Sequence, residues 1–180
     1  MTINYTLDQF KDQINSQPVV SLYQQLCLDM ETPITIFSRF LTNSQFVLLE
    51  GISENTKKGR FSYFGFDPYL SLKFTDSTCL KKSSKGTTTE SYSNIYTYLE
   101  SLLTMYRQTT DTELPFTSGL MGTFSYECMT HLEEVPLPPK RELNTPFAQF
   151  IVPKTLLIYD NLYHQLTIVR NVFKEDTQDL

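Results

Sequence analysis

The chain has 180 residues, of which 40% are hydrophobic and 19% charged, and its formal net charge is -5. This balance is typical of a globular protein that is long enough to bury a core, and it excludes a disordered chain. The basic residues are fewer than the acidic ones and are scattered along the chain. We therefore expect no nucleic-acid partner, because binding a phosphate backbone needs a basic stripe or patch.

Cysteine usage and the amino terminus predict where the protein resides. Cys27, Cys79 and Cys128 are far apart and odd in number, which indicates reduced thiols rather than a disulfide framework or a zinc site. The start of the chain, MTINYTLDQF, has neither a basic nor an apolar signal segment. No apolar run approaches the roughly 18 residues of a membrane span. We expect a cytoplasmic protein without a membrane partner.

Three helices are predicted at the beginning of the chain. Thr6 and Gln9 fit a capping box at the start of the first helix, which Pro18 ends. Apolar residues at helical spacing over residues 19–30 predict a second helix. The dipeptide at 32–33, Thr-Pro, is typical of the cap and first residue of a third helix.

Strand patterns follow from residue 45. The continuous apolar run QFVLLEG, residues 45–51, predicts a strand that is buried on both faces. Two aromatic-rich strands are expected on either side of a break at Asp67-Pro68. Residues 81–94 are poor in apolar side chains and predict a solvated loop or an edge hairpin. Residues 95–106 then predict the longest amphipathic helix.

The last third of the chain predicts more strands. GLMGTFSYE, residues 119–127, indicates a strand whose glycines allow other backbone to approach closely. The proline-rich residues 136–146 predict a loop. TLLIYDNLYHQLTIVRN, residues 155–171, predicts a hairpin that turns around Asp160-Asn161. The order of elements predicts an α+β fold with mainly antiparallel sheets and flanking helices.

The sequence shows no catalytic apparatus of its own. His131 and His164 are the only histidines, and neither has the neighbours that a catalytic triad or a zinc site needs. Gly119 and Gly122 lack the lysine of a phosphate-binding loop. We expect no catalytic residue and no metal ligand in this chain.

Six segments occur in the order and spacing of a known family. They are PVVSLYQQL, TPITIFSRF, FVLLEG, GRFSYFGFDP, GLMGTFSYE and PKTLLIYDNLYHQLTIVRN. Together they make the chain similar, over roughly residues 18 to 172, to the amino-terminal region of the large subunit (component I) of anthranilate synthase. Ser125 departs from the pattern, since the family usually has glycine there. Component I of aminodeoxychorismate (para-aminobenzoate) synthase shares much of the pattern and stays open, as do a stand-alone amino-acid-binding module and a purely structural fragment.

The resemblance implies that residues 1–180 form an amino-terminal domain of the family's α/β sandwich, with the carboxy-terminal chorismate-binding half absent. The complete family enzyme converts chorismate to anthranilate with Mg2+, whose ligands lie in that other half. A glutamine amidotransferase subunit (component II) supplies the ammonia. We therefore expect this chain to be inactive on chorismate by itself. We also expect apolar surface that the other half would cover to favour self-association.

The resemblance also implies part of a pocket for L-tryptophan, the feedback inhibitor. The family's Leu-Leu-Glu-Ser element and a later basic residue correspond here to Leu48, Leu49, Glu50, Gly51 and Arg60. Glu50 and Arg60 would complement the ligand's ammonium and carboxylate, and a leucine would face the indole. From the residues alone, Glu50 and Arg60 could instead pair with each other or with water. Gly51 lacks the usual serine hydroxyl, which predicts binding that is weaker by on the order of 1–3 kcal/mol.

Overall fold

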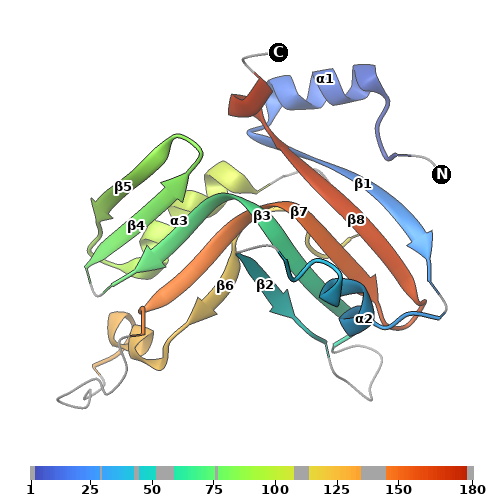
Figure 1. Ribbon diagram of the computed structural model, residues 1–180. Helices are drawn as coiled ribbons and strands as arrows, with labels where there is room; N and C mark the ends of the chain where they lie inside the picture. Colours follow the sequence, from blue (N-terminus) through green and yellow to red (C-terminus); the bar gives the residue numbers. More distant parts are fainter. Residues whose placement is uncertain are drawn as a thin grey trace.

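The fold is a strongly curled antiparallel sheet with helices on both sides (Figure 1), in a computed structural model that describes residues 3–28, 30–42, 45–51, 59–75, 77–107, 114–134 and 145–177. The elements in chain order are α1 (Leu7–Ser16), β1 (Val19–Cys27), α2 (Pro33–Ser38), β2 (Phe46–Leu49), β3 (Phe61–Phe74), β4 (Thr78–Ser83), β5 (Gly86–Ser91), α3 (Ile95–Tyr106), β6 (Met121–Phe124), the 3-10 helix η1 (Tyr126–His131), β7 (Ala148–Asp160), β8 (Gln165–Phe173) and the 3-10 helix η2 (Lys174–Thr177). Every pairing between these strands is antiparallel. The predicted α+β class is confirmed.

Two long strands, β3 and β7, run through the whole sheet and pair with each other. In one half of the sheet β2 adds to β3, while β8 and then β1 add to β7. In the other half β4 and then β5 add to β3, while β6 adds to β7. Between the halves, Pro68 lies opposite Pro153 and the register shifts before Leu70. Because proline cannot donate a ladder hydrogen bond, pairing weakens at this point, where β3 and β7 bend into the arch of Figure 1.

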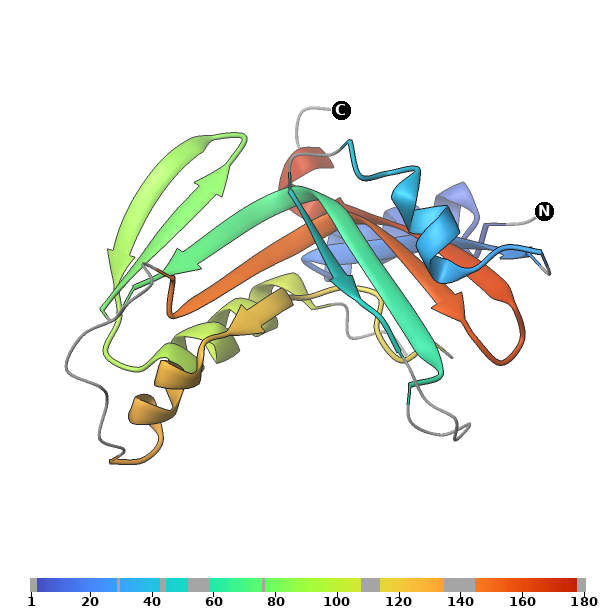
Figure 2. The same cartoon turned by 60° about the horizontal axis from the view of Figure 1, so that its bottom comes forward.

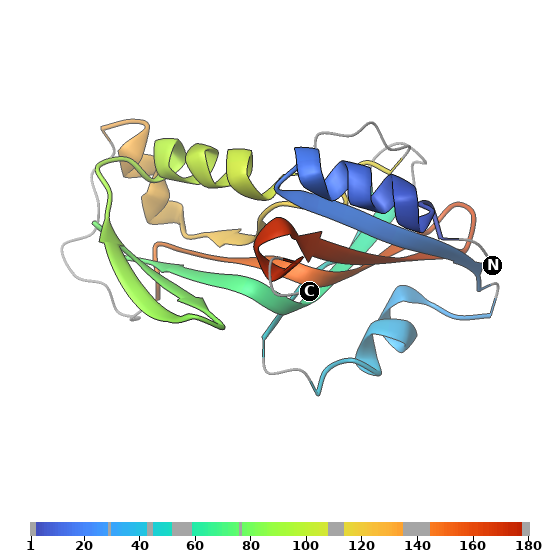
Figure 3. The ribbon, with the colours of Figure 1, turned by 90° about the horizontal axis from the view of Figure 1, so that it is seen from above.

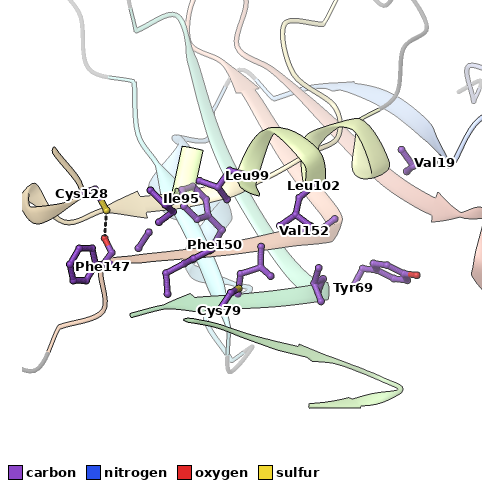
Figure 4. Packing of buried hydrophobic residues seen from close by; sticks show 14 of the residues in the cluster. Val19, Tyr69, Cys79, Ile95, Leu99, Leu102, Cys128, Phe147, Phe150 and Val152 are labelled. Carbon is purple, nitrogen blue, oxygen red and sulfur yellow. Dashed lines mark hydrogen bonds between the residues drawn. The ribbon is translucent and has the colours of Figure 1, made fainter. Parts of the chain in front are cut away.

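The helices cover the sheet unequally. Figure 3 shows α1 and α3 on one side of the sheet and α2 on the other. Ile95, Leu99 and Leu102 repeat on one face of α3 and enter the largest buried cluster (Figure 4). On the opposite side, Phe37 of α2 stacks on Phe64 of β3 with a centroid distance of 5.3 Å. The core therefore consists of separate clusters on the two faces of one sheet. No helix in the described ranges is long and apolar enough to cross a membrane.

Most of the local sequence signals give the expected elements. The capping box of Thr6 and Gln9 begins α1, and Thr32 caps α2 with Pro33 in its first turn. The helix at 95–106 is confirmed as α3. The expected last hairpin is confirmed as β7 and β8, which are joined by a turn immediately after Asp160.

The helix expected over residues 19–30 is wrong, because residues 19–27 form β1, paired in register with β8. The apolar spacing fitted a helix, but nine residue pairs with a distant strand outweigh that local preference. The burial expected for residues 45–51 is also wrong. Phe46 and Leu49 are 41% and 43% exposed, because β2 pairs along only one side with the strands that the structure describes.

Two expected interruptions of the sheet are not found. The break at Asp67-Pro68 is wrong, since β3 continues through it with a register shift while Asp67 takes a positive φ of 52°. The loop over residues 81–94 is also wrong, because β4 and β5 pair across this region and form the edge hairpin that was the alternative. The loop expected at 136–146 lies, except for its last two residues, outside the described ranges.

Candidate functional site

Strand β2 carries the first two residues of the proposed pocket. Leu48 lies opposite Phe64 and Leu49 opposite Tyr63 on β3, and successive strand residues point to opposite faces of a sheet. Leu48 packs against the buried cluster beneath α2, whereas Leu49 is 43% exposed. Of the two leucines, Leu49 is therefore the one with apolar surface left for a ligand.

Glu50 follows β2 directly and is exposed to solvent. Among the residues that the structure describes, its carboxylate has no hydrogen-bond or ion-pair partner. In particular, Glu50 does not pair with Arg60, which binds a different carboxylate. Glu50 thus offers a negative charge that the described protein groups do not neutralise.

Gly51 occupies a position with no room for a side chain. A Cβ atom built on it would lie 2.4 Å from the carbonyl oxygen of Gly59 and 2.5 Å from that of Phe61. Both neighbours are backbone atoms, which cannot rotate away as a flexible side chain can. The Gly51 amide donates to Oγ of Ser62 at 3.1 Å. Close packing therefore requires glycine at position 51 in this chain. The difference from the family's usual serine is not only a missing hydroxyl group.

Arg60 is held by Asp160 of β7. Its Nε lies 3.0 Å from both carboxylate oxygens, and its Nη2 donates to Oδ2 at 2.6 Å. The guanidinium also lies 4.8 Å from the ring centroids of Phe61 and Tyr163, a distance at which cation–π attraction operates. Nη1 takes no part in the pairing with Asp160. A ligand carboxylate at Arg60 would therefore meet a guanidinium whose charge is already shared.

The Asp160 carboxylate is nearly buried, with the residue 6% exposed. It also accepts backbone N–H bonds from Leu162 at 2.9 Å and Tyr163 at 3.3 Å. Burial by itself raises the pKa of Asp160, but the hydrogen bonds from Arg60 and these two amides outweigh burial and lower the pKa below its usual value. Asp160 therefore stays ionised and anchors the turn between β7 and β8.

Asn161 links the end of β2 and the start of β3 to the turn after β7. Its Nδ2 lies 3.4 Å from the carbonyl oxygens of Gly51 and Gly59 and 3.2 Å from Oγ of Ser62. Its backbone amide donates to the carbonyl of Arg60 at 2.8 Å. We call the residues of this network the strand-end cluster: Gly51, Gly59, Arg60, Ser62, Asp160 and Asn161.

The structure thus brings Gly51 and Arg60 into one network, places Glu50 and Leu49 beside it, and turns Leu48 into the core. Ser62, Asp160 and Asn161 were not among the residues that the sequence pointed to as a site. Asp160-Asn161 was visible only as a turn, and a contact across one hundred positions leaves no local signal.

Cys128 and His131 lie away from this cluster. In the described ranges, no three or more His, Cys, Asp and Glu residues gather closely enough to hold a metal ion. The Cys128 thiol donates to the carbonyl of Phe147 at 2.9 Å inside the core (Figure 4). His131 packs its ring near Phe147 with a centroid distance of 6.0 Å. Both side chains therefore make packing contacts around Phe147.

Known proteins are similar to this chain in sequence and in fold. Anthranilate synthase component 1 from Acetivibrio thermocellus is 27% identical over 168 residues, which cover 93% of this chain. Anthranilate synthase component 1 from Aquifex aeolicus is 25% identical over 182 residues and covers 98% of this chain. The chain is similar to component 1 of anthranilate synthase. The resemblance stated from the six sequence segments is confirmed.

The similarity concerns one part of component 1. The aligned residues make up 34% and 36% of the two relatives, so the chain spans about one third of their length. The crystal structure of anthranilate synthase component I from Streptococcus pneumoniae TIGR4 shares the fold, with a TM-score of 0.55 and 21% identity over 84% of this chain and 32% of that chain. No protein-family model matches the chain.

Proposed function

We propose that this chain is the amino-terminal, structural and regulatory part of an anthranilate synthase large subunit. The supporting observation is the extent of the similarity to component 1, which reaches 98% of this chain in one relative. The complete enzyme would act in tryptophan biosynthesis in the cytoplasm and convert chorismate to anthranilate. A glutamine amidotransferase subunit would supply ammonia, and Mg2+ would bind to residues outside the matched third.

Within that enzyme, the surface around Glu50 would form part of a regulatory L-tryptophan site. The carboxylate of Glu50, which has no partner among the described residues, suits the ligand's ammonium, and exposed Leu49 suits its indole ring. Nη1 of Arg60 would donate to the ligand's carboxylate. Because Asp160 already shares the guanidinium charge, we expect Glu50 to contribute more to affinity than Arg60.

The strand-end cluster would keep this surface in shape before the ligand arrives. Asn161 connects the end of β2, the start of β3 and the turn after β7. A site held by such a network needs less ordering on binding, which favours affinity. Asp160 and Asn161 would thus act as positioning residues rather than as ligand contacts.

A chimeric enzyme tests the proposed function. The chain replaces the matched third of Acetivibrio thermocellus component 1, in bacteria that lack their own component 1 and need added tryptophan. In medium rich in ammonium, we expect the chimera to restore growth without tryptophan. The same relative without its matched third is the control and should not restore growth.

Other outcomes distinguish the alternatives. A second chimera joins the chain to the remaining part of an aminodeoxychorismate synthase component I. Rescue of cells requiring para-aminobenzoate by this second chimera, without rescue by the first, would show that the chain comes from an aminodeoxychorismate synthase. Failure of both rescues, together with tight tryptophan binding by the isolated chain, would show a stand-alone amino-acid-binding module. Failure of both rescues without tryptophan binding would contradict the proposed function and leave a structural role.

A further inference from the structure

A separate pocket lies beyond the proline bend of β3, away from the strand-end cluster. Its volume is about 180 Å³, whereas drug-sized ligands occupy pockets of about 300–1,000 Å³. The pocket therefore suits a smaller molecule. Its lining combines charged and aromatic side chains, which include Tyr69, Lys81, Lys85, Glu90, Tyr106 and Glu175.

The pocket is bounded by segments from both halves of the sheet. The 3-10 helix η2 follows β8 in one half, and the hairpin of β4 and β5 belongs to the other half. Figures 1 and 2 show the turn of this hairpin pointing toward η2. Lys85 in the turn pairs with Glu175 of η2 at 2.7 Å. A molecule in the pocket would therefore contact both halves across the bend.

The charged side chains of the pocket balance each other. Lys81 pairs with Glu90 at 2.9 Å, and Lys85 pairs with Glu175. Hydrogen bonds from Lys85 and Tyr69 lower the pKa of Glu175, so this carboxylate is ionised at neutral pH. With two charges of each sign, the pocket favours neither a simple anion nor a simple cation. It complements a ligand that carries both charges.

Three groups of the pocket keep hydrogen-bonding capacity within the described part of the chain. Both hydrogen bonds that Glu175 accepts end on Oε2, so Oε1 is left without a partner there. Nζ of Lys81, on a side chain that is only 17% exposed, donates to Glu90 alone, although an ammonium has three N–H donors. The Tyr106 hydroxyl bonds to no described residue. These groups are available to a ligand.

Tyr106 brings the spare groups into relation with each other. Burial raises the pKa of Tyr106, and the charges of both ion pairs also act on its hydroxyl. The hydroxyl therefore stays protonated and lies within electrostatic reach of both pairs. Its ring packs against Tyr69 and Phe173 with centroid distances of 5.9 and 6.2 Å, which fixes the position of the hydroxyl. A carboxylate at this place could accept from Lys81 and Tyr106 together.

We propose that this pocket binds a small amino acid, whose carboxylate accepts from Lys81 and Tyr106 and whose ammonium donates to Oε1 of Glu175. The bound amino acid would hold the hairpin of β4 and β5 to η2. This site differs from the proposed tryptophan surface at Glu50, which lies near the start of β3. Because every group in the pocket belongs to this chain, the inference does not depend on the proposed function.

A titration of the chain with L-serine tests the inference. L-Serine has a small side chain that suits a cavity of this size, and two analogues each lack one of its charges. 3-Hydroxypropanoate lacks the ammonium, and ethanolamine lacks the carboxylate. Amide shifts in two-dimensional NMR spectra report the binding. We expect L-serine to shift residues 81–90 and 174–177, and each analogue to bind about tenfold more weakly or less.

Two results of this titration would overturn the inference. One is no binding of L-serine at concentrations up to about 10 mM, which corresponds to less than about 3 kcal/mol of affinity. The other is binding of either analogue as tightly as L-serine, because both charges would then not be recognised.

Tyr106→Phe removes a hydroxyl that has no partner among the described residues and keeps the packed ring. We expect it to weaken L-serine binding by about tenfold, because a hydrogen bond to the charged carboxylate is lost. Its urea unfolding should stay unchanged. Tyr126→Phe is the control, since Tyr126 is 76% exposed on η1. Equal L-serine affinity in Tyr106→Phe and the unaltered chain would contradict the proposed site.

Glu175→Gln tests the contact with the ammonium. Without the carboxylate, the preference for L-serine over 3-hydroxypropanoate should fall toward one. A purely structural role of Glu175 would weaken both ligands equally and keep the preference, which would overturn the assignment. Asp176→Asn is the matched control, because Asp176 pairs with Lys154 instead and its loss should keep the preference.

Discussion

Arg60 and Asp160 are one hundred positions apart and form a bidentate ion pair where β3 begins and β7 ends. The pair closes the end of the sheet at which Glu50 and Gly51 lie. Asn161, next to Asp160, extends the contact to the carbonyl of Gly51. The proposed ligand surface is therefore supported by a turn that belongs to a different hairpin.

Removing the charge of Asp160 should destabilise the protein. Asp160→Asn loses an anionic acceptor at a site that is 6% exposed, and we expect the free energy of unfolding to fall by about 1–3 kcal/mol. Asp67→Asn is the matched control, because Asp67 pairs with Arg170 but both side chains are 49% exposed; it should change little. Urea unfolding measures both variants. Equal stability of Asp160→Asn and the unaltered chain would show that the ion pair between Arg60 and Asp160 does not stabilise the fold.

The same pair predicts how stability depends on pH. The folded pKa of Asp160 is lowered, since the bonds from Arg60 and the turn amides outweigh burial. Its contribution is therefore fully present above the unfolded pKa of about 3.9 and is lost as the pH falls through the lower folded value. We expect the free energy of unfolding to decline below about pH 4, less steeply in Asp160→Asn. Identical slopes in the two proteins would rule out Asp160 as a contributor.

Replacing Gly51 by the serine that is usual in the family should not strengthen tryptophan binding. Any Cβ there would lie 2.4 Å from the backbone oxygen of Gly59, so the end of β2 would have to move. We expect Gly51→Ser and Gly51→Ala to lower thermal stability similarly and neither to strengthen binding. Stronger tryptophan binding by the serine variant alone would show that the hydroxyl matters and that the backbone adjusts easily.

Neutralising Glu50 should weaken tryptophan binding. A charge-assisted hydrogen bond contributes about 1.5–3 kcal/mol, so we expect Glu50→Gln to raise the dissociation constant about tenfold or more in the chimeric enzyme. Glu100→Gln, at an exposed position of α3, is the control. Because this chain contains no tryptophan residue, it adds no background to the fluorescence of the ligand. Tryptophan residues in the other part of the chimera do add background, and a titration of that part alone corrects for it. Unchanged affinity in Glu50→Gln would remove Glu50 from the site.

Local signals predicted the elements whose structure is decided locally. The capping residues of α1 and α2 and the alternating pattern around Asp160 gave the correct helices and the correct hairpin. Residues 19–27 failed because their apolar spacing fits a helix, while their pairing with β8 depends on residues about 150 positions away. Strand formation here is a property of the assembled sheet, which no short window of sequence contains.

The site was only partly visible for the same reason. Glu50 and Arg60 were selected through the resemblance, and the sequence left open whether they pair with each other. In the structure, Arg60 forms an ion pair with Asp160, and Glu50 is exposed to solvent. The steric requirement for glycine at position 51 comes from Gly59 and Phe61 folding back over it. Such a contact has no signature in composition or spacing.

The proposed function makes this chain one part of an enzyme whose reaction centre lies elsewhere. The most direct measurement is anthranilate fluorescence after chorismate, ammonium and Mg2+ are given to the chain, to the remaining two thirds of Acetivibrio thermocellus component 1, and to both together. We predict anthranilate only when both are present. Anthranilate formed by this chain alone, or none formed by the two together, would contradict the claim.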